Sequence, residues 1–252
     1  SLVYHLDDSG TLTISGTGEM ADYRNSSSSS RPPWYSIRSS INSVVIEDGV
    51  TSIGNYAFDD CSALTDVYYN GSLSDFAKIS IGSYNSDFTG ATLHCGDTVY
   101  ETWGRCGVSL AYYLDGSGTL TISGTGQMTD YYNSSAVPWS SNRSSITSVV
   151  IEDGVTSIGS WAFCNCDALT SVSIGSGVTS IDSYAFSGCD AVTDVYITDI
   201  AAWCGITFED SSSNPINYAE NIYVNSELVT ELVIPDGVTS IGSSAFYNCD
   251  AL

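Results

Sequence analysis

The residues of this chain that most readily do chemistry are its eight cysteines. Two of them, Cys164 and Cys166, are separated by one residue, and thiolates so closely spaced can ligate zinc. No second cysteine pair and no nearby histidine supplies the rest of a four-ligand set. Four of the eight cysteines recur at one position of a repeated pattern: Cys61, Cys166, Cys189 and Cys249. Recurrence at one position indicates small apolar side chains in a core, so we expect no metal and no cofactor.

Cys95 and Cys106 lie outside that repeated position and flank a predicted β-hairpin. Exported proteins commonly pair their cysteines, so a disulfide between Cys95 and Cys106 is one expectation. The other expectation is that both are buried free thiols, like the repeated cysteines.

The sequence contains few residues suited to acid–base or nucleophilic catalysis. The chain has two histidines, His5 and His94, and Tyr113 replaces His5 in an internal copy. No Gly-x-Ser-x-Gly nucleophile motif is present. Nothing marks two of the 29 acidic residues as a glycosidase pair, and no calcium-loop motif occurs. We therefore expect a protein that is not an enzyme.

The charge of the chain excludes several classes of partner. Six basic residues against 29 acidic ones give a net charge of -23, whereas nucleic-acid binding needs clustered Lys and Arg. The same shortage argues against a polybasic membrane surface, and no apolar run approaches the length of a membrane span. A hydrophobic content of 42% is enough to build a folded core.

An internal repeat of 23 residues must supply the elements that position all these side chains. Six apolar residues recur at that step: Ile158, Ala162, Phe163, Cys166, Leu169 and Val172 return as Ile181, Ala185, Phe186, Cys189, Val192 and Val195. Further copies begin at Val50 and Val238. The last copy stops at Leu252, inside the repeat, so we expect a chain truncated at its C-terminus.

Each copy contains two short extended pieces and one tighter segment. Val-x-Ile predicts a strand, Asp-Gly a turn, and Val-Thr-Ser-Ile-Gly a second extended piece. The Ala-Phe segment before each cysteine predicts a single helical or 3₁₀ turn. One copy buries too little to fold alone, whereas stacked copies share their apolar faces. The sequence therefore predicts a mostly β repeat solenoid with short parallel strands and coils of about 23 residues.

A longer duplication overlies the repeat. Residues 1–69 closely resemble 109–174, which predicts a first module over 1–108 and a second over 109–252 in one continuous solenoid. Three links are too short for a coil and predict inserted hairpins. They join Tyr4 to Ile14, Tyr112 to Ile122, and Val224 to Ile234.

The string Ile-Gly-x-x-Ala-Phe-x-x-Cys-x-x-Leu-Thr-x-Val-x-Ile, followed by Gly-Val-Thr-Ser-Ile-Gly, resembles the BspA-like leucine-rich repeat. The resemblance covers most of the chain. It implies a right-handed, mostly β leucine-rich-repeat coil. It also implies a secreted or cell-surface bacterial protein, in a family linked to adhesion to host proteins and to other cells.

The middle residue of each Val-x-Ile strand points away from the core, because side chains alternate along a strand. The middle residues are Val45, Tyr68, Val150, Ser173, Tyr196 and Val233, and Asp66 and Asp194 lie two residues before two of them and also point outward. The candidate partner-binding face consists of Asp66, Tyr68, Ser173, Asp194 and Tyr196. Tyrosine is favoured in protein interfaces, so a host or bacterial surface protein is the expected partner. The alternative is a plain solvent-facing sheet in which β-propensity alone selects tyrosine and valine.

Two other functions stay open at this point. The repeats would serve as a structural spacer if activity resided in another domain. Four tryptophans motivate a carbohydrate-binding module: Trp34, Trp139, Trp161 and Trp203. Because Trp34 and Trp139 each follow a proline at matching positions of the duplication, a packing role competes with this hypothesis.

Overall fold

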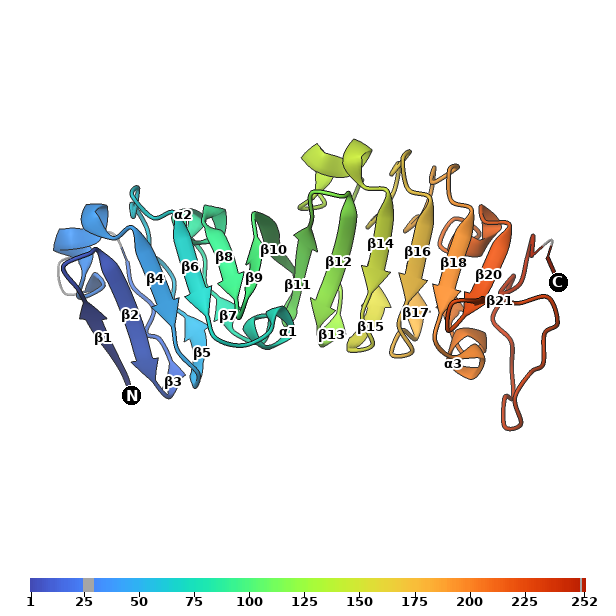
Figure 1. Cartoon of the computed structure of the whole chain (residues 1–252), viewed down its shortest axis with the longest axis horizontal. Coiled ribbons are helices and arrows are strands. Elements are labelled where there is room, and N and C mark those ends of the chain that lie inside the picture. Colours follow the sequence, from blue (N-terminus) through green and yellow to red (C-terminus); the bar gives the residue numbers. More distant parts are fainter. Residues whose placement is uncertain (25–29, 250) are drawn as a thin grey trace. The chain divides into compact units, whose positions relative to one another are not determined.

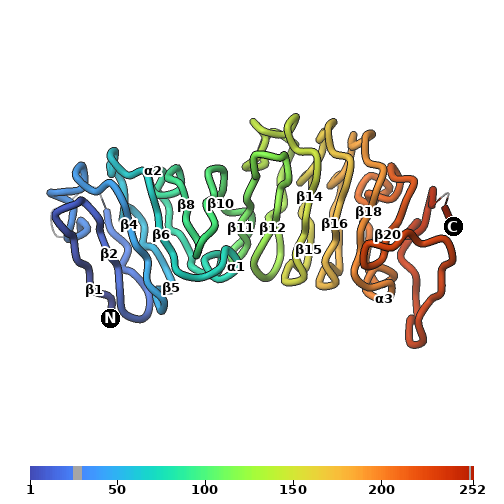
Figure 2. Tube along the Cα trace, viewed as in Figure 1, coloured from blue at the N-terminus to red at the C-terminus, as the bar shows by residue number. Residues whose placement is uncertain are grey.

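The computed structural model describes residues 1–24, 30–249 and 251–252. It contains two compact units, Ser1–Gly104 and Arg105–Leu252. Each unit is built of stacked coils whose strands line up side by side (Figures 1 and 2). The module boundary between residues 108 and 109, which follows the duplication, stays a proposal, as does a single continuous solenoid.

The first unit contains two sheets. The larger has the order β1-β2-β4-β6-β8-β9, with β1 Leu2–Leu6, β2 Thr11–Gly16, β4 Ser43–Ile46, β6 Asp66–Tyr69, β8 Thr92–Cys95 and β9 Thr98–Tyr100. The smaller has the order β3-β5-β7, with β3 Gly18–Glu19, β5 Val50–Ile53 and β7 Ser80–Ile81. Strands β2, β4, β6 and β8 are parallel, as stacked coils require.

The second unit repeats this plan over more coils. Its larger sheet has the order β10-β11-β12-β14-β16-β18-β20-β21, with β10 Thr102–Gly107, β11 Leu110–Leu114, β12 Thr119–Gly124, β14 Ser148–Ile151, β16 Ser171–Ile174, β18 Asp194–Ile197, β20 Asn221–Val224 and β21 Glu227–Leu228. Its smaller sheet has the order β13-β15-β17-β19, with β13 Gly126–Gln127, β15 Val155–Ile158, β17 Ser180–Ile181 and β19 Thr207–Phe208. Parallel strands again dominate, which confirms the predicted repeat solenoid.

Short helices fill the coils that depart from the 23-residue period. The described helices are α1 Leu73–Phe76, α2 Ser86–Gly90, α3 Ile200–Cys204, and the 3₁₀ helices η2 Tyr35–Ser40, η3 Ser140–Ser145 and η4 Pro215–Asn217. Ser72 caps α1 and Asp199 caps α3, each accepting a hydrogen bond from a backbone N–H three residues later. The capped helices place Phe76 of α1 and Trp203 of α3 in the core.

The core consists of rows of identical positions in successive coils. Val149, Val172 and Val195 face one another across β14, β16 and β18, and each is 0% exposed. Backbone hydrogen bonds follow the same step, since Thr170 N–H donates to the Thr147 carbonyl and Thr193 N–H to that of Thr170. One coil of the stack therefore contains 23 residues, which is the period of the repeat.

The predicted hairpins are confirmed in the two copies of the duplication and only partly in the third place. Tyr4 faces Ile14 in β1–β2, and Tyr112 faces Ile122 in β11–β12. In the third hairpin Val224 faces Glu227, not Ile234. Strand β21 occupies the edge of β20, so residues 232–234 form no strand and the outward strand position predicted for Val233 is wrong.

The Ala-Phe segments differ from the single helical or 3₁₀ turn that we expected. They are successive hydrogen-bonded turns, as where Ala57 N–H donates to the Gly54 carbonyl and Cys61 N–H to that of Phe58. Tyr56 and Asp60 take positive φ angles of 57° and 60°, which interrupts any helix. Within the residues described, no helix has the length and apolar character needed to cross a membrane.

Candidate binding surface

The outward face of the larger sheet in the first unit carries a compact cluster of Asp66, Tyr68 and His94. The His94 Nε2 atom lies 2.7 Å from the Asp66 carboxylate. The His94 ring stacks on Tyr68 with centroids 4.3 Å apart. Parallel pairing places these side chains together, because Tyr68 of β6 faces His94 of β8. Hydrogen bonds from His94 and then from Thr65 lower the pKa of Asp66, so its carboxylate is charged at neutral pH.

This Asp66–His94 cluster borders a hollow in the surface. The hollow has a volume of about 490 Å³, and its lining includes Tyr68, His94, Glu47 and Asp48. Tyr68 is 40% exposed, so its phenol is available to a partner. Aromatic rings beside carboxylates match a basic side chain, through ion pairing and cation–π contact.

A matching cluster of Asp194, Tyr196 and Tyr223 lies on the outward face of the larger sheet in the second unit. Tyr196 stacks on Tyr223 with centroids 4.6 Å apart, and the Asn221 amide donates to the Asp194 carboxylate at 3.1 Å. Partial burial, followed by a hydrogen bond to Asp194, raises the pKa of Tyr223. Ser173, the remaining predicted residue, faces Tyr196 from the neighbouring strand β16.

Sequence reasoning missed His94 and Tyr223, each of which completes one of these clusters. Both follow the longer coils, in which the step from Val67 to Leu93 and from Val195 to Ile222 exceeds 23 residues. The signal was present, since Thr-Leu-His-Cys and Asn-Ile-Tyr-Val alternate apolar and polar residues like the other strands.

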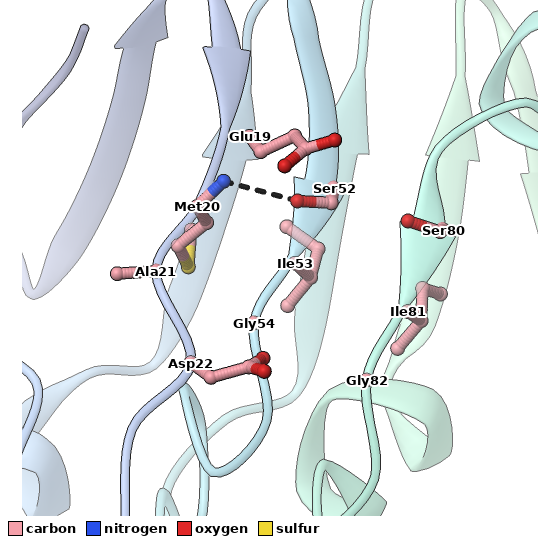
Figure 3. Close-up of a pocket in the computed structure, with 10 residues that line it drawn as sticks. All are labelled: Glu19, Met20, Ala21, Asp22, Ser52, Ile53, Gly54, Ser80, Ile81 and Gly82. Atoms are coloured by element: carbon pink, nitrogen blue, oxygen red, sulfur yellow. Dashed lines mark hydrogen bonds between the residues drawn. The ribbon is translucent and has the colours of Figure 1, made fainter.

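A second hollow lies over the smaller sheet of the first unit (Figure 3). Its volume is about 540 Å³, and Glu19, Ser52 and Ser80 are among its lining residues. The Ser52 hydroxyl accepts a hydrogen bond from Met20 N–H at 3.0 Å (Figure 3). This hollow contains none of the predicted site residues.

Three of the four tryptophans hold neighbouring coils together and are not available to a ligand. Each is at most 2% exposed and donates its indole N–H to an alanine carbonyl: Trp34 to Ala57, Trp139 to Ala162 and Trp203 to Ala245. The packing role therefore applies to Trp34 and Trp139. Trp161 is half-buried and stacks on Tyr184 with centroids 4.6 Å apart.

Seven of the eight cysteines are buried, and Cys249 is half-buried. Cys164 and Cys166 are both in the core. Among the residues described, no group of three or more His, Cys, Asp or Glu side chains is placed to hold a metal ion. Cys95 lies on β8 and Cys106 on β10, in different units, so their pairing stays a prediction.

Burial makes these thiols unreactive. It raises the pKa of Cys61, Cys95, Cys106 and Cys166 to about 12. Since the thiolate is the reactive form, we expect a chromogenic disulfide reagent at neutral pH to label the half-buried Cys249 first and the others only on unfolding. Unfolded, unreduced protein should then give eight thiols. A count of six would show one disulfide, as the pairing of Cys95 with Cys106 predicts, and peptide mapping of the unreduced protein would identify the two cysteines.

Sequence comparison places this chain in a family. The pattern of the BspA type leucine rich repeat region matches in six copies, over residues 34–87 and 140–252. The chain belongs to the BspA-type leucine-rich repeat family. The matched residues include β4 to β7 of the first unit and β14 to β21 of the second, and they contain both outward clusters except His94. Among curated proteins, none matches this chain.

Several solved structures are similar to this BspA-type chain at low identity. A leucine-rich repeat protein from Eubacterium ventriosum is 18% identical, with 98% of this chain and 92% of that chain covered and a TM-score of 0.30. A leucine rich cell surface protein from Faecalibacterium prausnitzii is 17% identical, with 100% and 92% covered and a TM-score of 0.29. A T. pallidum leucine rich repeat protein is 15% identical, with 100% and 87% covered and a TM-score of 0.27.

Proposed function

We propose that this BspA-type chain is a non-enzymatic, protein-binding module exposed on the bacterial exterior, with a role in adhesion. The observation that carries the proposal is the recurrence of one arrangement on two sheets. Asp66 meets a Tyr–His stack in the first unit, and Asp194 meets a Tyr–Tyr stack in the second. β-propensity alone selects tyrosine and valine, but it does not select an aspartate hydrogen-bonded beside an aromatic stack.

The chemistry of the clusters defines the partner. Carboxylates and aromatic faces on a rigid sheet suit arginine or lysine side chains, and a net charge of -23 favours encounter with a basic surface. We therefore propose a host or bacterial surface protein that presents basic residues. Rigid strands support this role because little conformational entropy is lost when they bind.

The test removes the clusters while keeping the fold. Serine occupies the equivalent position in β16, at Ser173, so Tyr68→Ser combined with Tyr196→Ser is compatible with the sheet. We expect this variant to bind at least about tenfold more weakly to any extracellular-matrix protein or bacterial cell that captures the wild type. Its melting temperature should remain within about 3 °C of wild type, because surface substitutions change stability little.

The matched control makes the same substitutions away from this face, as Tyr84→Ser with Tyr184→Ser, at residues that are 62% and 45% exposed. Retained binding in the control and weakened binding in the cluster variant would support the proposal. Equal binding by both variants would eliminate the named face. If the wild type binds nothing in such a panel, the spacer function replaces adhesion.

Carbohydrate binding has less support from the structure. Of the four tryptophans that motivated it, three are in the core, so Trp161, half-buried and stacked on Tyr184, is the one that a sugar could reach. An array of bacterial and host glycans that retains no labelled protein would remove this alternative.

A further inference from the structure

The hollow beside Tyr68 lies on the outward face of the first unit, where strands β4, β6 and β8 run side by side (Figure 1). Parallel pairing places Val45, Tyr68 and His94 in one outward row across these strands. Because side chains alternate along a strand, the residues two positions further on form a second outward row. This second row consists of Glu47, Asn70 and Gly96, which all line the hollow.

Two glycines keep the hollow open between its aromatic walls. Gly96 has a positive φ of 55°, and a Cβ added there would have the Gly71 carbonyl oxygen, at 3.9 Å, as its nearest neighbour. Gly71 lies against the ring of Tyr69, since a Cβ at Gly71 would come within 2.5 Å of that ring. The space beside Tyr68 and Tyr69 is therefore free to take a side chain from a partner.

The polar side chains at the edge of the hollow are not used by the fold. Within the part of the chain that the structure describes, the carboxylates of Glu47 and Asp48 accept no hydrogen bond and form no ion pair. The exposed side chain of Asn70 likewise bonds to no described residue. Asp66, by contrast, is already engaged by His94 at 2.7 Å. Two charged groups of the hollow are thus available to a ligand.

The second unit shows how the same Glu-Asp pair is used where the coil keeps its 23-residue length. Glu152 accepts a hydrogen bond from the Ser123 hydroxyl at 2.6 Å. Asp153 accepts one from the backbone N–H of Ser176 at 2.8 Å and another from its hydroxyl at 3.1 Å. In the first unit, Gly71 takes the position of Ser176, and the longer coil continues into α1. The departure from the repeat therefore leaves the acidic pair of the first unit without these donors.

We propose that this hollow binds the guanidinium group of an arginine side chain of the partner, which deepens the proposed function and rests on it. A planar guanidinium stacks on an aromatic ring, here that of Tyr68, while its N–H groups donate to the carboxylates of Glu47 and Asp48. The ammonium group of lysine is a compact, strongly hydrated charge that does not stack in this way. Arginine is therefore favoured over lysine at this site.

The probe is a peptide with blocked ends in which one arginine lies between glycines, titrated with the chain of residues 1–252 and followed by saturation-transfer NMR. We expect saturable binding with a Kd of about 1 mM or lower. The same peptide with lysine should bind at least about fivefold more weakly, because its ammonium does not stack. A peptide with citrulline, which has nearly the shape of arginine without its charge, should bind at least about tenfold more weakly.

Glu47→Gln combined with Asp48→Asn removes both charges and keeps an acceptor oxygen at each position. This variant should bind the arginine peptide at least about tenfold more weakly, because its hydrogen bonds to the guanidinium are no longer between charged groups. The matched control is Glu152→Gln with Asp153→Asn, which changes the net charge equally in the second unit. Its affinity should stay within about twofold of wild type, and circular dichroism should show that both variants are folded.

Equal affinity for the arginine and lysine peptides, equal loss in the two double variants, or no saturation below about 10 mM peptide would overturn the proposal. The result is separable from that of the adhesion test. If a captured partner depends on Tyr68 and Tyr196 but the arginine peptide does not bind, the hollow is not an arginine site and the proposed function stands. If the peptide binds but the wild type captures nothing, adhesion fails and the arginine site stands.

Discussion

Gly159→Ala is expected to destabilise the second unit by about 3 kcal/mol or more, because it forces two coils apart. A Cβ at Gly159 would lie 2.1 Å from the Thr129 carbonyl oxygen and 2.8 Å from its carbon. Both are backbone atoms, so no side-chain rotation relieves the contact. Gly159 does not have a positive φ, which means that the effect comes from this close approach and not from backbone conformation. At roughly 2–4 °C per kcal/mol, the melting temperature should fall by about 6–12 °C.

The matched control is Asp182→Ala, at the same repeat position one coil later. Burial, with further contributions from Asp130 and Glu209, raises the pKa of Asp182. A carboxyl whose folded pKa is raised opposes folding once it is charged, and this cost disappears as the pH falls through the folded pKa. Asp182→Ala should therefore be neutral or stabilising at pH 7, and its benefit should vanish in acid.

Urea unfolding followed by circular dichroism, at neutral pH and again at about pH 3, measures both effects. If Gly159→Ala unfolds at the same urea concentration as wild type, the two coils do not approach as closely as the structure has them. If Asp182→Ala gains as much stability in acid as at neutral pH, the charge of Asp182 is not the cause.

The core and its register followed from the sequence because both depend on apolar periodicity. Val149, Val172 and Val195 repeat at one spacing, and burying all three requires that the coils stack in register. The hairpin that joins Tyr4 to Ile14 was predictable for a related reason, since ten residues are too few for a coil and enough for two short strands.

The outward surface was harder to predict because the repeat constrains the core alone. His94 and Tyr223 join their clusters through coils of altered length, so counting by 23 residues misplaces them. The left-handed backbone at Trp161 and Tyr184, with φ of 64° and 61°, is unusual for aromatic residues, and no propensity rule indicates it. The predicted hairpin from Val224 to Ile234 was wrong because sequence spacing does not show that β21, at residues 227–228, pairs with β20.

Trp139→Ala should lower the free energy of unfolding of the second unit by about 3–5 kcal/mol, the usual range for a large buried aromatic side chain. Trp139 is 1% exposed and stacks on Phe163 at 5.7 Å. Its removal leaves a cavity between coils and also leaves the Ala162 carbonyl without its donor, which lies at 2.9 Å. Both consequences act within the core, so the loss should be insensitive to salt.

Trp139→Phe separates the two contributions. Phenylalanine retains most of the ring contact but has no N–H, so this variant should lose about 1–3 kcal/mol, the cost of an unsatisfied buried acceptor together with a small void. Trp161→Ala is the matched control, because Trp161 is half-buried and stacks on the exposed Tyr184, and it should cost about 1 kcal/mol or less.

The hydrogen bond from a buried indole N–H to an alanine carbonyl depends on contact between coils and not on one sequence spacing. Trp139 and Ala162 are 23 residues apart in sequence, whereas Trp203 and Ala245 are 42 apart, yet both pairs form the same hydrogen bond. Trp203→Phe should therefore cost as much as Trp139→Phe, within about 1 kcal/mol. A much smaller loss of stability in Trp203→Phe would mean that other contacts hold the last coil of the second unit. If Trp161→Ala lost as much stability as Trp139→Ala, the buried indole hydrogen bond would not be what stabilises the coils.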